Sequence, residues 1–259
     1  MTFTILGPGL GVCLFLGLLL ALESGRRLGR RRAELDPEAA RAGLATVEGA
    51  VFGLLGLLMA FTLSGAASRL DARRELVAQE ANAIGTAWLR IDLVSTDLQP
   101  PLRDLFRRYL DSRLAIYRKL THLEQALQEW ERSTRLQQEL WTAAVAATRA
   151  TGTPQAALLL LPAVNEMIDI TTTRLMATRQ HPPAIIFVML VALALGSSLL
   201  AGYRMAEAKG RSWLHMVGFA GVMSLTIYVT LDIEYPRLGL IRVDAADEVL
   251  VDLRKSMDR

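Results

Sequence analysis

The sequence predicts an all-α membrane protein with four transmembrane helices and a helical extramembrane region between the second and the third. Two observations predict this class. Hydrophobic residues make up 52% of the 259 residues, and they gather in four stretches almost free of charge, with the charged residues between them. The long interval between the second and third stretches is rich in Leu, Ala, Arg, Glu and Gln and shows no alternating strand pattern. Together these features exclude a simple soluble domain.

The four apolar stretches have the length of membrane-spanning helices, because a hydrocarbon core needs about 20 apolar helical residues. They cover approximately residues 3–22, 46–67, 184–203 and 213–231. A signal peptide is the alternative for the first stretch, but residues 1–9 lack the basic region of such peptides. We therefore expect transmembrane helices in residues 1–67 and 184–231, an extramembrane region at 68–183 and a C-terminal tail at 232–259.

The distribution of basic residues bears on the orientation. An even number of spans places both termini and the long middle region on one side of the membrane. The two short loops on the other side carry nine bases, namely Arg26, Arg27, Arg30, Arg31, Arg32, Arg41, Arg204, Lys209 and Arg211. The side of the middle region has seven close to the spans, namely Arg69, Arg73, Arg74, Arg174, Arg179, Arg237 and Arg242. The positive-inside rule weights short loops most, so it favours these loops in the cytoplasm of a bacterial inner membrane.

The middle region predicts a series of helices. They should cover residues 68–91, 98–120, 123–149 and 155–180. Ser95-Thr96-Asp97 offers an N-cap for the second helix, with Pro100-Pro101 in its first turn. Gly152-Thr153-Pro154 should separate the last two helices, and Pro162 should start or kink a segment.

Composition and motifs argue against an enzyme, a metal site and a nucleic-acid-binding protein. The net charge is only +3, and bases and acids are interspersed, whereas nucleic-acid binding needs a one-sided basic surface. The single Cys13 excludes a disulfide framework and a multi-cysteine metal site. His122, His181 and His215 lie far apart, and no catalytic motif is present. We therefore expect no catalytic residue, no metal and no cofactor.

Span two carries two stripes at helical spacing. One consists of small residues that permit close approach of helices in lipid, namely Gly49, Gly53, Gly56 and Ala60. The other lies about 100° around the helix and consists of Leu54, Leu57 and Phe61, with Ser64 at the end of that face. Both stripes are compatible with ordinary packing inside one chain. The alternative is that copies of span two surround an axis, with the small stripe against a neighbour and the large residues lining a hydrophobic constriction that gates by dewetting.

Glu48 is the one charged residue inside a predicted span. An ionisable residue in a span is a candidate for a functional role, here a polar or gating one. Its place near the start of the helix also permits a simpler interpretation, a carboxylate stabilised by the helix dipole.

Two segments resemble bacterial bestrophins. Residues 58–75, LMAFTLSGAASRLDARRE, are similar to the segment that leaves span two in that family, approximately L-A-F-R-x-N-x-A-Y-x-R-W-W-E-A-R. The matching positions are Phe61, Ala66, Arg69, Arg73 and Glu75. Arg174-Leu175, followed by Pro182-Pro183, is similar to the bestrophin segment before span three. The resemblance makes Arg69, Arg73 and Arg174 candidates, like Glu48, for a polar or gating role.

The chain resembles a family of bacterial bestrophin-like membrane proteins over more of its length. The similarity lies in residues 53–69, 80–87 and 232–242. It implies an all-helical homo-oligomer, pentameric in bestrophins, with an axial pathway for small inorganic ions and a neck at Phe61 and Leu57. The family also implies a cytosolic middle region, which conflicts with the orientation favoured by the arginines.

Three departures from the bestrophin pattern limit what can be transferred. Leu70-Asp71 stands where bestrophins have paired aromatic residues, and Thr62 and Ser64 replace an Arg and an Asn. The acidic C-terminal run that binds calcium in animal bestrophins is not reproduced, so calcium gating is not inferred.

The leading hypothesis is an oligomeric, passive ion channel in the bilayer, with a hydrophobic neck on span two. Two rivals come from other classes. The long helices over residues 98–149 fit a membrane-anchored interaction protein whose spans only anchor and oligomerise it. An ion-coupled transporter that uses Glu48 is the third hypothesis.

Overall fold

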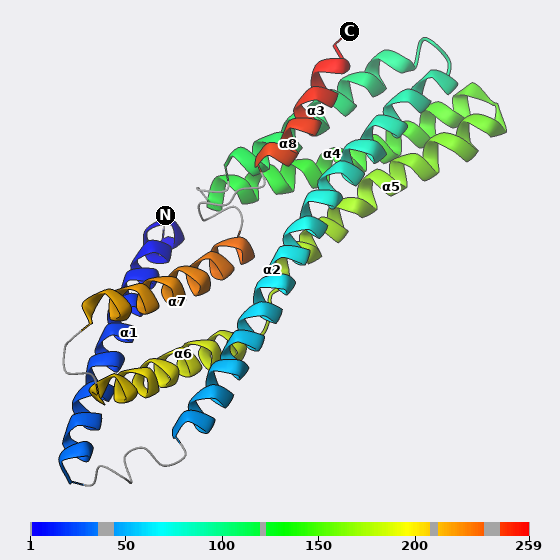
Figure 1. Ribbon diagram of the computed structural model, residues 1–259. Coiled ribbons are helices and arrows are strands. Elements are labelled where there is room, and N and C mark those ends of the chain that lie inside the picture. Colours follow the sequence, from blue (N-terminus) through cyan, green and yellow to red (C-terminus); the bar gives the residue numbers. More distant parts are fainter. Residues whose placement is uncertain (1, 36–43, 120–122, 208–211, 236–243, 259) are drawn as a thin grey trace. The chain divides into compact units, whose positions relative to one another are not determined.

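The computed structural model describes residues 2–35, 44–119, 123–207, 212–235 and 244–258, and these residues contain helices and no strand (Figure 1). The eight α-helices and two 3₁₀ helices, in chain order, are α1 (Thr2–Leu35), α2 (Leu44–Leu89), η1 (Arg90–Leu93), α3 (Gln99–Arg118), α4 (Leu123–Thr151), α5 (Pro154–Arg179), α6 (Ala184–Arg204), η2 (Met205–Glu207), α7 (Trp213–Glu234) and α8 (Asp244–Ser256). The predicted all-α class is confirmed.

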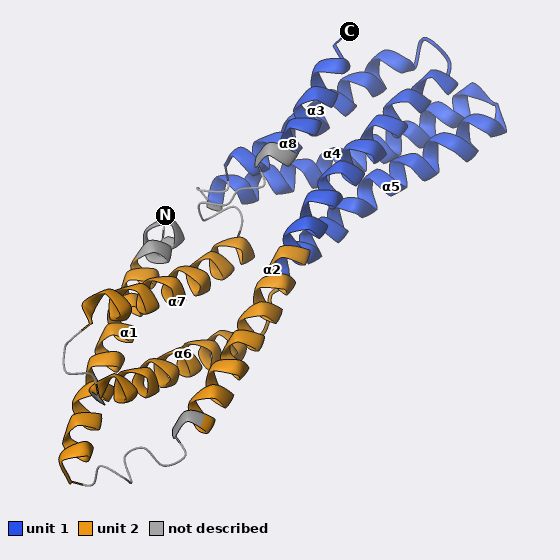
Figure 2. Cartoon of the chain, viewed as in Figure 1, with its two compact units in different colours: residues 1, 69–180, 242–259 blue, residues 2–68, 181–241 orange. Residues whose placement is uncertain are grey.

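The chain divides into two compact units (Figure 2). The membrane unit comprises residues 2–68 and 181–241, and the bundle unit comprises residues 69–180 and 242–259. Four helical segments of the described residues are long and apolar enough to cross a membrane. The apolar part of each lies in the membrane unit, in α1, the first half of α2, α6 and α7.

The membrane unit is held together by an apolar core and by very close contact between α1 and α6. Its core residues are Leu18, Leu22, Leu55, Leu190, Ala194, Met216, Ala220 and Ile227. A methyl group on Gly25 would overlap the carbonyl oxygen of Leu199, and one on Gly202 would overlap that of Leu22. Small residues at these positions therefore allow the two backbones to touch, as is typical of helices packed in lipid.

The bundle unit packs residues 69–89 of α2 with α3, α4, α5 and α8. Its largest fully buried apolar side chains include Ile84, Ile91, Phe106, Tyr109, Leu110, Leu136, Leu140 and Leu160. Gly152, with φ +72°, lies in the left-handed region directly after α4 and ends that helix. Pro154 then begins α5, where a missing N–H costs nothing.

One expectation about a helix end is corrected, and one of the two alternatives for Pro162 is excluded. The N-cap of α3 is Leu98, and it makes no side-chain capping hydrogen bond, so Ser95-Thr96-Asp97 does not cap this helix. Ser95 instead donates its backbone N–H to the hydroxyl of Thr151, at 3.0 Å. Pro162 does not start a segment, because α5 runs through it. Arg90 donates to the carbonyl oxygen of Leu159 in the turn before this proline, at 2.7 Å.

Helix α8 lies in the region for which the sequence analysis expected only a tail. Leu250 and Met257, at helical spacing, are buried in the bundle unit. Arg107 of α3 donates to the carbonyl oxygen of Met257 at 2.6 Å, and Arg254 donates to Asp111 of α3 at 2.9 Å. Part of the bestrophin-like C-terminal stretch, residues 236–242, lies outside the described residues, as do His122, Arg41, Lys209, Arg211, Arg237 and Arg242.

Candidate functional site: the open face of α2

The larger stripe of span two lies on an open face of the membrane unit. Leu54, Leu57 and Phe61 are 54%, 55% and 69% exposed, and Ser64 is exposed as well. The opposite side of the same helix is packed, with Leu55 and Ala66 fully buried. Large apolar side chains are therefore directed away from the core of their own unit over about two helical turns.

The small stripe is equally open. Gly49, Gly53, Gly56 and Ala60 are all exposed. A methyl group built on any of the three glycines would meet no described atom within 4 Å. In the described part of the chain, this stripe thus packs against no other helix, in contrast to Gly25 and Gly202 in the α1–α6 contact.

Glu48 is joined to α6. Its Oε2 atom lies 2.8 Å from Nη1 of Arg204, and its side chain is only 12% exposed. Helix α2 begins at Leu44 and has no acidic residue in its first turn, so Glu48 lies beyond the turn where a carboxylate would meet the helix dipole most directly. This ion pair connects α2 to α6 at one end of the membrane unit.

The three arginines singled out in the sequence lie in the bundle unit. Arg73 donates to the carbonyl oxygens of Ala177 at 3.1 Å and Gln180 at 2.9 Å, where α5 ends. It therefore satisfies carbonyls that a helix C-terminus leaves without intrahelical donors. Arg69 is half-buried, and Arg174 contacts a buried carboxylate.

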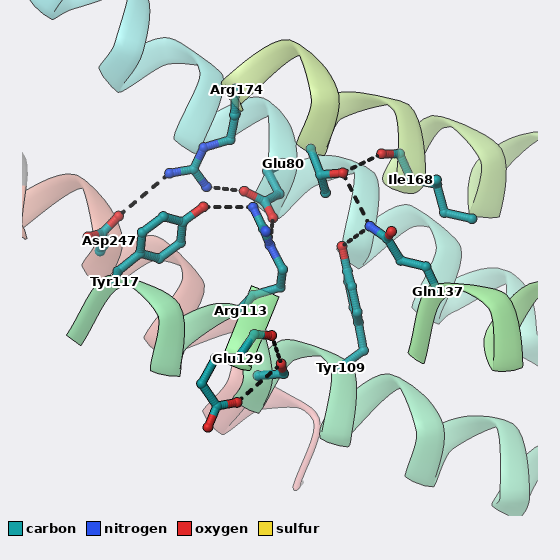
Figure 3. Close-up of polar contacts among 11 residues, drawn as sticks. Glu80, Tyr109, Arg113, Tyr117, Glu129, Gln137, Ile168, Arg174 and Asp247 are labelled. Carbon is teal, nitrogen blue, oxygen red and sulfur yellow. Dashed lines mark hydrogen bonds and ion pairs between the residues drawn. The ribbon is translucent and has the colours of Figure 1, made fainter. Parts of the chain in front are cut away.

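That carboxylate belongs to Glu80, which lies at the centre of a buried ion cluster (Figure 3). The sequence analysis did not predict this cluster. Glu80 of α2 is fully buried and accepts hydrogen bonds from Arg113 of α3, at 2.6 Å, and from Arg174 of α5. Arg113 also donates to the hydroxyl of Tyr117 at 2.7 Å, and Arg174 approaches Asp247 of α8 at 3.9 Å. One carboxylate thus connects α2, α3 and α5 and reaches a fourth helix, α8, through Arg174.

The electrostatics of this cluster favour a charged Glu80. Burial by itself would raise the pKa of Glu80, but the charges of Arg113 and Arg174 and their hydrogen bonds hold that pKa below its usual value. Burial also raises the pKa of the Tyr109 hydroxyl, which accepts a hydrogen bond from Gln137 at 3.4 Å. A signal for the cluster was present in the sequence, because Glu80 lies at helical spacing between the apolar Val77 and Ile84.

A second buried carboxylate lies in the membrane unit, where α7 ends. Glu234 is fully buried, and its Oε1 atom lies 2.9 Å from Nδ1 of His181. The imidazole stacks on Tyr235, with the ring centroids 4.7 Å apart. The sequence analysis noted His181 only as one of three histidines that lie far apart. Among the described residues, no three His, Cys, Asp or Glu side chains gather as a metal site would require.

Comparisons with known proteins agree with this architecture. The family model of the bestrophin-like domain matches residues 13–247. The fold is similar to the crystal structure of a bacterial bestrophin homolog from Klebsiella pneumoniae that carries a point mutation. The TM-score is 0.68 and the sequence identity 13%, over 93% of this chain and 98% of that chain. Curated protein sequences give no match. On the family match, the chain belongs to the bestrophin-like domain family.

Proposed function

We propose that the chain is a passive ion channel in which α2 helices of identical subunits surround an axis. Leu54, Leu57 and Phe61 would form the hydrophobic neck of the pathway, with Ser64 at its end. The observation that carries the proposal is the exposure of these three large apolar side chains on a helix whose opposite side is packed. The family supports the same function, because its resemblance to bestrophins implies an axial ion pathway.

A neck of this kind has a simple physical basis. Leu54 and Phe61 are seven residues apart, so the stripe extends about 10 Å along the helix at a rise of 1.5 Å per residue. Rings of Leu and Phe over that length form a hydrophobic constriction, which can stop ions when it dewets. The control of flux would then depend on the size of the side chains at the neck.

The small stripe supplies the subunit contact in this proposal. Gly49, Gly53, Gly56 and Ala60 would allow the backbone of a neighbouring copy to approach closely, because no Cβ branch or long side chain intervenes. We propose a homo-oligomer, pentameric as in bestrophins, in a bacterial inner membrane, without enzymatic activity. Its partners would be the lipid bilayer, other copies of the chain and small inorganic ions.

Flux through the purified protein in liposomes tests the proposal. We compare the wild type with Phe61→Ala and Leu57→Ala, which widen the neck, and expect several-fold faster ion flux in both variants. Leu225→Ala is the matched control, since Leu225 of α7 is 61% exposed but lies outside α2. It should conduct like the wild type. If neither the wild type nor the widened variants conduct, the channel hypothesis is wrong, and the hypothesis of a membrane-anchored interaction protein is favoured.

A further inference from the structure

The C-terminal end of α1 carries a group of exposed arginines that have no part in the proposed ion pathway. Arg27, Arg30 and Arg31 are all exposed, and we call them the α1 arginine cluster. At 100° per residue they fall within an arc of about 100° on the helix surface. Their centre lies about 170° from Gly25 and Gly29, the residues that contact α6 and η2. The packing of α1 therefore directs the cluster away from α6 and η2.

The charges of this cluster are only partly balanced. Glu23 accepts two hydrogen bonds from Arg26, both at 3.0 Å, and one from Arg27 at 2.9 Å. Arg30 and Arg31 form no ion pair with any acid among the described residues. Residues 23–34 of α1 hold five arginines and two glutamates, Glu23 and the exposed Glu34, which lies on the same face as Arg30 and Arg31. The arginines outnumber the carboxylates, so this surface carries an excess of positive charge.

The cluster lies along α1 at the outer edge of the lipid headgroup layer, within reach of the headgroups for long side chains. The apolar part of α1 ends at Leu22, and the three arginines follow about 8 to 14 Å further along the helix axis. The headgroup layer on each side of a bilayer is about 5 to 8 Å thick. Helical Cα–Cβ bonds tilt toward the N-terminus, here toward the membrane, so the long side chains of these arginines can reach back to the headgroups.

We propose that Arg27, Arg30 and Arg31 bind the phosphate groups of anionic lipids at this end of α1. Guanidinium groups match phosphate oxygens in a bidentate geometry. Clusters of basic residues directly outside a span are attracted to anionic membrane surfaces, with about 1 kcal/mol for each residue. The proposal goes beyond ion conduction and holds whether or not the protein conducts.

The test uses the full chain in detergent micelles mixed with phosphatidylglycerol or with phosphatidylcholine. Binding of phosphatidylglycerol is measured by native mass spectrometry and by the increase in the unfolding temperature. We expect phosphatidylglycerol, but not phosphatidylcholine, to raise the unfolding temperature, and the increase should shrink in high salt. Each Arg→Gln substitution in the cluster should weaken phosphatidylglycerol binding about fivefold, the factor that corresponds to about 1 kcal/mol.

The triple variant Arg27→Gln/Arg30→Gln/Arg31→Gln is compared with Arg118→Gln/Arg135→Gln/Arg149→Gln. The second variant removes the same charge from exposed arginines of the bundle unit. The double variant Arg30→Gln/Arg31→Gln keeps the Glu23–Arg27 pair and serves if the triple variant folds poorly. Equal phosphatidylglycerol binding in the cluster and control variants would overturn the proposal. An equal increase with inorganic phosphate would also overturn it, in favour of a site for soluble anions. If the variants lose stability equally in both lipids, the arginines act only on the dipole of α1.

Discussion

The two halves of α2 meet opposite conditions within one helix. In residues 69–89 the inward positions are filled, with Val77, Ile84 and Trp88 buried in the bundle unit and Glu80 held by two arginines. In residues 46–68, two adjacent stripes have no partner among the described residues of the chain. Within the subunit, the second half of α2 is packed on its inward side, whereas the first half leaves two stripes exposed, as the proposed assembly through α2 requires.

Replacement of Glu80 should reduce the unfolding free energy more than any other change considered. It tests whether residues 69–89 of α2 stabilise the subunit. Glu80→Gln preserves the shape of the side chain but leaves Arg113 and Arg174 without their carboxylate. Removal of one partner of a buried ion pair costs about 3–5 kcal/mol. We expect that loss in the unfolding free energy, measured by tryptophan fluorescence, since Trp88, Trp130 and Trp141 all lie in the bundle unit.

Glu75→Gln is the matched control for this variant. Glu75 lies on the same half of α2, is exposed, and accepts a hydrogen bond from Gln79 at 3.2 Å. Its replacement should change stability by less than about 0.5 kcal/mol, as is usual for surface positions. If Glu80→Gln is as mild as Glu75→Gln, the buried cluster does not stabilise the bundle unit.

Lowering the pH should reduce the stability of the bundle unit gradually, and by less than Glu80→Gln does. The folded state lowers the pKa of Glu80, so its contribution is complete above the unfolded value of about 4.3 and is lost as the pH falls through the folded value. We expect a steady unfolding temperature of the bundle unit from neutral pH to about 5 and a decline below about 4.3. Glu80→Gln should show a shallower decline, and an identical acid profile in both proteins would contradict this assignment.

The sequence was sufficient for those features that depend on neighbouring residues. Hydrophobic length predicted the four spans, and helical spacing predicted the two stripes of α2, because both signals are local. Spacing also could have found α8, through Leu250, Leu253 and Met257.

Features that depend on distant partners were not predictable in this way. Glu80 and Arg174 are separated by 94 residues, and only the packed bundle brings them together. The contact of Gly25 with α6 and the open space around Gly53 also follow from packing, although both glycines belong to GxxxG patterns. Such a pattern predicts that two helices approach closely but does not identify the partner.

A large residue at Gly53, on the open half of α2, should change the stability of the single subunit less than the changes described above. Gly53→Leu meets no described atom at the Cβ position and replaces a poor helix former by a good one, with a gain of up to about 0.8 kcal/mol. In the assembly, the same side chain would separate neighbouring α2 helices. We therefore expect unchanged helix content by circular dichroism but a smaller particle mass by light scattering in detergent. Gly218→Leu, at an equally open position on α7, should keep the mass of the wild type. A Gly53→Leu protein with the full mass would show that the small stripe is not the subunit contact.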